Sequence, residues 1–165
     1  MRCPTLVAAT SISKYFAYFL HHLMKDGKMF IVKEVKEGLL KWFEDENLQR
    51  KCMIHIAMNL PALAISFLNT FVSLFKEQPK TKLKVIDQSR LPLVHVYAFS
   101  SAENQKNELK IECEKQLGKS LDIQIQFVRN VAPHKDMFRI SIPLTLDILC
   151  DTLGQSEIVK RQKLC

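Results

Sequence analysis

The chain has 165 residues, of which 47% are hydrophobic and 25% are charged. These values are ordinary for a globular protein of one domain, and they exclude low-complexity and collagen-like chains. The net charge of +7 is uneven, because residues 1–100 carry 14 Lys/Arg against 8 Asp/Glu, whereas residues 101–165 carry 10 against 9. Such a basic excess favours a polyanionic partner such as RNA, although many basic proteins bind no nucleic acid.

The five cysteines and five histidines show no spacing that is typical of a metal site. No C-x-x-C pair occurs, and the number of cysteines is odd. We therefore predict no metal site and interpret the cysteines as free thiols in a reducing compartment. His55 and His95 fall within strand patterns, where we expect a hydrogen-bonded structural role.

The first 25 residues have two interpretations. They contain no acidic residue, three basic residues and several Ser/Thr, a composition that fits a mitochondrial presequence. Their apolar run is too short and too interrupted for a membrane span, and we predict no membrane association. The interpretation that we prefer is an amphipathic packing helix over residues 12–24.

Next along the chain the sequence predicts a turn, a helix and a strand. The dipeptide at residues 26–27 (Asp-Gly) is a turn signal. Residues 32–44 place apolar side chains at helical spacing between charges, which predicts an amphipathic surface helix. Residues 52–58 are almost all apolar and precede a breaker, which is typical of a strand buried on both faces of a parallel sheet.

Asn59 and Pro61 stand where this strand gives way to the next predicted helix, which extends to Lys76. In open α/β sheets, ligands bind in a crevice at the carboxyl ends of the strands. The Asn59 amide is therefore a candidate site residue. Asn is also a favoured helix cap, and position alone favours a cap over a ligand contact.

The second half of the chain repeats the alternation of strand and helix. Residues 77–92 form a polar, basic loop that is either solvated or faces an RNA. Residues 93–99 predict a second buried strand. A capping box that begins at Ser100 starts a helix through Leu117, and Gly118 ends that helix.

The last predicted elements form a hairpin. Residues 122–131 alternate as a strand does, residues 132–136 turn the chain, and residues 137–144 form a further strand. Residues 145–165 read as a polar tail with some helical character. Because a short turn joins the last two strands, they must be antiparallel.

Together these elements predict an α/β fold, with a partial doubly wound, Rossmann-like sheet that ends in an antiparallel hairpin. This is the shape of the class I methyltransferase sheet. The analogy concerns the fold and does not by itself establish an activity.

Three segments together carry a resemblance to one family. They are DGKMF at residues 26–30, MNLPA at residues 58–62 and VRNVAPHKDM at residues 128–137. They resemble the carboxyl-terminal half of the eukaryotic and archaeal tRNA (guanine-37 N1)-methyltransferases, and the eukaryotic branch fits better. This resemblance divides the chain into an unassigned helical segment (1–25), half of a methyltransferase catalytic domain (26–144) and a polar tail (145–165).

Members of that family transfer a methyl group from S-adenosylmethionine to N1 of the guanine beside the anticodon. The resemblance implies that Asp26 and Gly27 contact the adenosine part of the cofactor. It implies that Asn59 contacts both the cofactor and the target guanine, and that Pro61 shapes the same turn; these two residues are the catalytic candidates.

Arg129 and Pro133 fall near the hairpin that flanks the RNA side in the family, and are the candidate RNA-binding residues. The resemblance further implies a monomer that binds the tRNA anticodon loop. It implies a location in the cytoplasm, the nucleus and the mitochondrial matrix.

The sequence also departs from the family. No G-x-G pattern occurs among its four glycines, and nothing matches the acidic residue that would serve as general base. The chain looks truncated, because the strand at 52–58 should lie mid-sheet beside a strand that the chain lacks. We therefore expect no measurable methyl transfer by this polypeptide alone. The alternative function is a non-catalytic α/β module that binds RNA or a protein.

Overall fold

A mixed four-stranded sheet organises residues 28–150, the part of the chain that the computed structural model describes. The strands are β1 (His55–Met58), β2 (Leu93–Ser100), β3 (Gln124–Ala132) and β4 (Lys135–Pro143), in the order β1-β2-β4-β3. β1 and β2 are parallel, and β4 is antiparallel to both β2 and β3. The α/β class, the parallel pair and the terminal hairpin are thus confirmed. The predicted helix over residues 12–24 lies outside the described residues.

Helical segments connect the strands. They are η1 (Ile31–Val35), α2 (Lys36–Glu44), α3 (Glu46–Lys51), η2 (Ile65–Phe71), η3 (Lys80–Lys82), η4 (Gln88–Arg90), α4 (Gln105–Leu117) and α5 (Leu146–Cys150). The helix expected over residues 32–44 is present as a π-helical turn that continues into α2. α5 begins inside the predicted polar tail, yet its Ile148 and Leu149 are buried in the core.

The prediction of a helix from Pro61 to Lys76 is wrong in both the type and the length of the helix. The structure has turns over residues 61–64 followed by the 3-10 helix η2. Ser73 takes a positive φ of 60°, which ends any helical run. The backbone N–H groups of Ser73 and Phe75 donate to the carbonyls of Ile148 and Leu149, so α5 replaces the helical hydrogen bonds of this segment.

α4 also begins later than predicted. Its N-cap is Asn104, whose side chain accepts from the Asn107 N–H at 3.4 Å. Ser100 ends β2 instead of capping the helix, and its hydroxyl donates to the Glu108 carboxylate at 2.5 Å. The predicted stop is confirmed, because Gly118 takes the left-handed conformation that favours glycine.

The two faces of the sheet differ in burial. One face, here called the helix-covered face, is buried against α4 and the other helical segments; its residues are Ile56, Met58, Val94, Val96, Ala98, Phe138, Ile140 and Ile142. The opposite face, here called the second face, is half-buried; its residues include Leu93, His95, Tyr97, Phe99, Met137, Arg139 and Ser141. A doubly wound sheet carries helices on both faces, whereas the described helices cover one.

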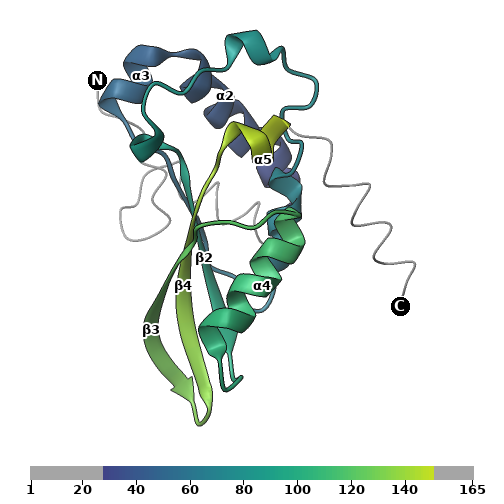
Figure 1. The fold of residues 1–165 in the computed structure, drawn as a ribbon, viewed down its shortest axis with the longest axis vertical. Helices are drawn as coiled ribbons and strands as arrows, with labels where there is room; N and C mark the ends of the chain where they lie inside the picture. The colour runs from purple at the N-terminus through teal and green to yellow at the C-terminus, as the bar shows by residue number, and fades with distance from the viewer. Residues whose placement is uncertain (1–27, 151–165) are drawn as a thin grey trace, which may run out of the picture.

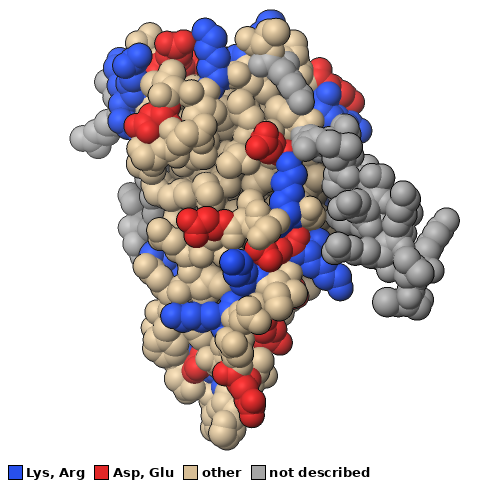
Figure 2. Space-filling view, in the orientation of Figure 1, with Lys and Arg blue, Asp and Glu red and all other residues tan. Residues whose placement is uncertain are grey.

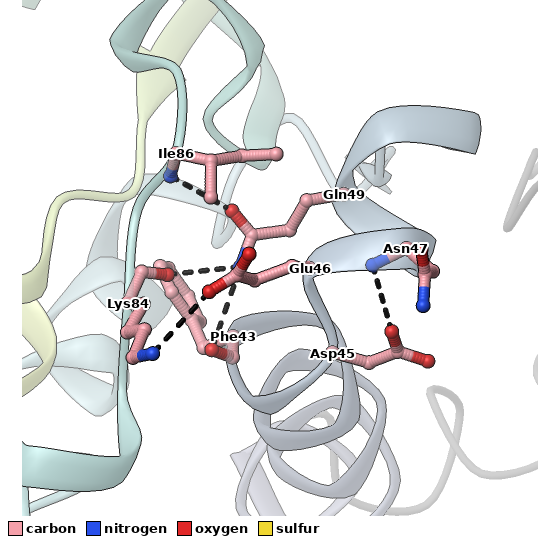
Figure 3. A network of polar contacts seen from close by, with 7 residues as sticks. All are labelled: Phe43, Asp45, Glu46, Asn47, Gln49, Lys84 and Ile86. Carbon is pink, nitrogen blue, oxygen red and sulfur yellow. Dashed lines mark hydrogen bonds and ion pairs between the residues drawn. The ribbon is translucent and has the colours of Figure 1, made fainter.

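Gln49 fastens α3 to the segment that leads into β2 (Figure 3). Its side chain is fully buried, and its Nε2 donates to the carbonyl of Lys84 at 2.9 Å and to that of Phe43 at 3.4 Å. Its Oε1 accepts from the Ile86 N–H at 3.1 Å. The segment predicted as a polar, basic loop at residues 77–92 is therefore anchored to α3 through its backbone.

A hydrogen-bonded ladder crosses the second face. His55 Nδ1 lies 2.9 Å from His95 Nε2, and His95 Nδ1 lies 2.9 Å from Ser141 Oγ. Burial, together with the charges of His55 and Arg139, holds the pKa of His95 below its ordinary value. The ladder joins β1, β2 and β4, which confirms the structural role predicted for both histidines.

We predict that Gln49→Ala lowers the free energy of unfolding by about 2–3 kcal/mol, because it removes the partner of the Ile86 N–H and of the carbonyls of Phe43 and Lys84, which are buried or partly buried. Urea denaturation measures this change. The matched control is Asn47→Ala in the same helix, where the side chain is exposed and the expected change is within about 0.5 kcal/mol. Equal stability of the two variants would contradict the role of Gln49.

We also predict that the free energy of unfolding falls as the pH is lowered through the ordinary histidine pKa of about 6.5. The reason is that the lowered pKa of His95 lets the unfolded chain bind more protons than the folded chain in this window. Urea titrations across the window should show a smaller pH dependence for His95→Gln. His134→Asn, at an exposed turn, should keep the wild-type dependence. An unchanged dependence in His95→Gln would refute the assignment.

Candidate active site

The predicted site residues that fall within residues 28–150 lie in loops and strands toward one end of the sheet. Because β1 and β2 are parallel, with Met58 opposite Val96, their carboxyl ends point to the same end of the sheet. At this end β4 begins and β3 finishes, with Asp136 opposite Ser100. Figure 1 shows the β3–β4 hairpin extending at this end, whereas α2 and α3 lie at the other. Asn59 therefore leaves β1 in the direction of the hairpin turn, although β1 stops level with Val96, four residues before β2 ends at Ser100.

Asn59 is exposed directly after β1, and its side chain makes no hydrogen bond to any residue between 28 and 150. It does not cap a helix, because the N-cap of η2 is Ala64. The half-buried Pro61 lies in a turn where the N–H groups of Leu63 and Ala64 donate to the carbonyl of Leu60, at 2.7 and 2.8 Å. The helix-cap interpretation is thus wrong, and the amide is available to a ligand.

An apolar hollow lies next to this turn. Its lining includes Phe30, Ile31, Met58, Leu60 and Phe67. Met58 and Leu60 flank Asn59 in the sequence, although neither Asn59 nor Pro61 lines the hollow itself. Asp26 and Gly27 lie outside the described residues.

The hairpin presents the other two predicted site residues, Arg129 and Pro133, and both are exposed. Arg129 follows a β-bulge in β3 and pairs with Met137. Pro133 and His134 form the turn, in which His134 takes a positive φ of 59°. The structure thus places Arg129 and Pro133 in the hairpin toward which the chain leaves β1, with β2 and β4 between β1 and β3.

Sequence reasoning missed a polar cluster at the base of the hairpin. Asp136 Oδ2 accepts from Gln105 Nε2 at 3.0 Å, and Asp136 Oδ1 accepts from Asn130 Nδ2 at 2.9 Å. Gln105 Nε2 also donates to the carbonyl of Ser100 at 3.2 Å. The cluster ties the hairpin to the end of β2 and to the start of α4. The capping-box pattern did indicate special interactions between the end of β2 and the start of α4. It predicted a helix cap at Ser100, whereas the structure has the hydrogen bonds of Gln105 there.

The lysine-rich segment at residues 77–92 lies away from this end. It precedes Leu93, at the amino end of β2. There the Lys84 ammonium lies 3.3 Å from the Glu46 carboxylate. Basic and acidic side chains are interspersed on the face of the molecule shown in Figure 2. The segment thus lies apart from Arg129 and Pro133, and the choice between a solvated and an RNA-facing loop stays a prediction.

The cysteines depart in part from the expected free thiols. Cys113 is a free thiol, and burial raises its pKa to about 12, which leaves it unreactive at neutral pH. Cys52 is disulfide-bonded, contrary to the prediction. No group of three or more His, Cys, Asp or Glu residues that could hold a metal ion occurs within residues 28–150. None of the helices in this range is long and apolar enough to cross a membrane.

Comparison with known proteins gives relatives that share one description, tRNA (guanine(37)-N(1))-methyltransferase. Those from Drosophila melanogaster, Anopheles gambiae and Xenopus tropicalis are 41%, 42% and 38% identical over 84%, 84% and 79% of this chain. The chain spans 30%, 24% and 26% of their respective lengths. No family model matches the sequence.

Among solved structures, the crystal structure of Trm5b from Pyrococcus abyssi shares 18% sequence identity with the chain. Its TM-score is 0.35, and the match covers 56% of this chain and 25% of that one, which is too weak a structural similarity to support an assignment. The sequence relatives do support an assignment, because their identity extends over most of this chain. The chain is therefore similar to a part of the carboxyl-terminal half of the tRNA (guanine(37)-N(1))-methyltransferases.

Proposed function

We propose that this chain provides part of the catalytic domain of a methyltransferase that acts on N1 of guanine 37 in tRNA and uses S-adenosylmethionine. One observation carries the proposal. Asn59, an exposed amide without a partner among residues 28–150, follows β1 on the side of the sheet toward which the β3–β4 hairpin extends, and family resemblance assigns that hairpin to the RNA side. The sequence relatives supply the reaction that such a site would perform.

The sheet order supports this proposal. In a doubly wound sheet the helices of the two halves cover opposite faces. The described helices cover one face, as one half of such a sheet would. We therefore propose that the edge of β1 that no described strand occupies corresponds to the boundary with the other half of a class I methyltransferase sheet.

The described residues would supply one part of a site for the adenosine end of S-adenosylmethionine. Asn59 offers donors and an acceptor next to the apolar hollow lined by Phe30, Met58 and Phe67, which is itself too small to enclose an adenine base. By resemblance, Asp26 and Gly27 complete this end. When bound, the cofactor supplies an activated methyl group. No described residue forms a glycine-rich cradle for its methionine end.

Asn59 would act by positioning. Its amide can donate to and accept from the edge of a guanine, which holds N1 toward the methyl donor. Pro61 restricts the backbone of the same turn, and this limits the orientations that the Asn59 amide can take. Guanine N1 carries a proton that a base must remove, and we assign that base to no described residue. Binding of S-adenosylmethionine is therefore a more direct test of the proposed role of this chain than methyl transfer is.

We predict that the chain binds S-adenosylmethionine, and that Asn59→Ala weakens this binding about tenfold, the effect of losing about 1.4 kcal/mol of hydrogen bonding. Isothermal titration calorimetry measures both affinities. Asn47→Ala is the matched control, because it removes an exposed amide from α3 at the opposite end. Its affinity should equal that of the wild type.

Two outcomes would contradict the proposal. If Asn59→Ala binds S-adenosylmethionine as tightly as the wild type does, Asn59 takes no part in the site. If the wild-type chain binds none, the function is better described as that of a non-catalytic RNA- or protein-binding module.

A further inference from the structure

The two strands of the β3–β4 hairpin hold three cations and one acid. Their sequences are QIQFVRNVA and KDMFRISIP, so the charged residues are Arg129, Lys135, Asp136 and Arg139. Since side chains alternate between the faces of a sheet, the register decides which of these charges share a face. The strand pairing therefore determines the electrostatic character of each face of the hairpin.

All three cations belong to the second face. Lys135 Nζ lies 4.7 Å from the centroid of the Phe99 ring, which itself belongs to that face. Arg139 is paired with Tyr97 and donates a hydrogen bond to Gln126. Arg129 pairs with Met137, whose other neighbour across the sheet is Phe99.

The single acid of these two strands belongs to the other face and is already satisfied. Asp136 pairs with Ser100, which is buried in the helix-covered face. Its two carboxylate oxygens accept from Gln105 Nε2 and Asn130 Nδ2, at 3.0 and 2.9 Å. These amides hold the carboxylate toward α4. The hairpin thus separates its charges, with the cations on one side and the acid on the other.

We propose that Arg129, Lys135 and Arg139, here called the hairpin cation face, bind the sugar-phosphate backbone of the tRNA substrate. This inference rests on the proposed function and deepens it, because it assigns a surface to the tRNA beyond the residues that family resemblance indicates. Across the sheet, Arg129 and Arg139 pair only with uncharged residues (Met137, Tyr97 and Gln126). Lys135 pairs with Ala132, and its ammonium lies over the Phe99 ring. Because the two strands place no acid on this face, the three cations present one sign of charge to a polyanion.

The spacing between neighbouring strands suits contacts with a sugar-phosphate backbone. Neighbouring strands lie about 4.8 Å apart, so cations on β3 and β4 are close enough to contact successive phosphates. Phosphate contacts fit this face better than base stacking, because Lys135 already sits over the Phe99 ring and the ring is half-buried. The face also adjoins the end of the sheet that carries Asn59, where a bound tRNA must present its guanine.

The test compares two triple variants with the same change of charge. R129Q/K135Q/R139Q removes the hairpin cation face, and K106Q/K110Q/K115Q removes three cations from α4. The probe is a fluorescently labelled, unmodified tRNA transcript with guanine at position 37, and anisotropy gives its affinity over a range of salt concentrations. We expect the hairpin variant to bind at least tenfold more weakly, with a salt slope reduced by about 2. The α4 variant should stay within about twofold of the wild type.

Further measurements distinguish a loss of charge from a loss of the folded structure. R129K/R139K keeps the charge and should keep most of the affinity, and thermal unfolding followed by circular dichroism checks that every variant folds. Equal losses in the two triple variants would overturn the proposal, as would competition by polyglutamate as effective as that by unlabelled tRNA. S-adenosylmethionine calorimetry on the hairpin variant reports on the proposed function separately, because the variant leaves Asn59 and the hollow intact. If the wild type binds S-adenosylmethionine but no tRNA, the surface proposal fails while the cofactor site stands.

Discussion

The parallel pairing of β1 with β2 is the constraint on which the site depends. It extends over only four residues of β1, from His55 opposite Leu93 to Met58 opposite Val96. A slip of one residue would turn Ile56 and Met58 away from the core and reverse the side of the sheet on which the chain leaves the strand. The burial of both residues therefore fixes where Asn59 emerges. The His55–His95–Ser141 ladder secures the same register from the second face.

Elements whose causes are local could be predicted from the sequence. The uncharged runs of β1 and β2 follow from burial, and the left-handed Gly118 follows from its missing side chain. The alternation predicted for residues 122–131 matches the strand β3, although most of its side chains are exposed. The 3-10 helix η2 could not be predicted, because its limits depend on hydrogen bonds to α5, which lies more than 70 residues further along the chain. No pattern within residues 61–76 carries that information.

In the candidate site, too, features with local causes could be predicted and features that depend on distant contacts could not. The position of Asn59 after β1 follows from the apolar run that ends there, so its place at a strand end was predicted correctly. Its helix-cap role was predicted wrongly, because that role assumed a regular helix after Pro61. The Asp136 cluster was missed for a related reason. It joins residues from β2, α4 and the hairpin, and only the folded sheet brings these together.

The position of the positive charges shows why residue counts alone do not locate an RNA surface. The excess in residues 1–100 points to the basic segment at 77–92, which precedes β2 at the amino end of the sheet. The hairpin lies in the half of the sequence that is nearly neutral, yet its strands place three cations and no acid on one face. This arises because strand alternation sorts neighbours in sequence onto opposite faces, so Lys135 and Asp136 no longer offset each other at the surface. A polyanion approaching the second face therefore meets a field that the composition of that half of the chain does not reveal.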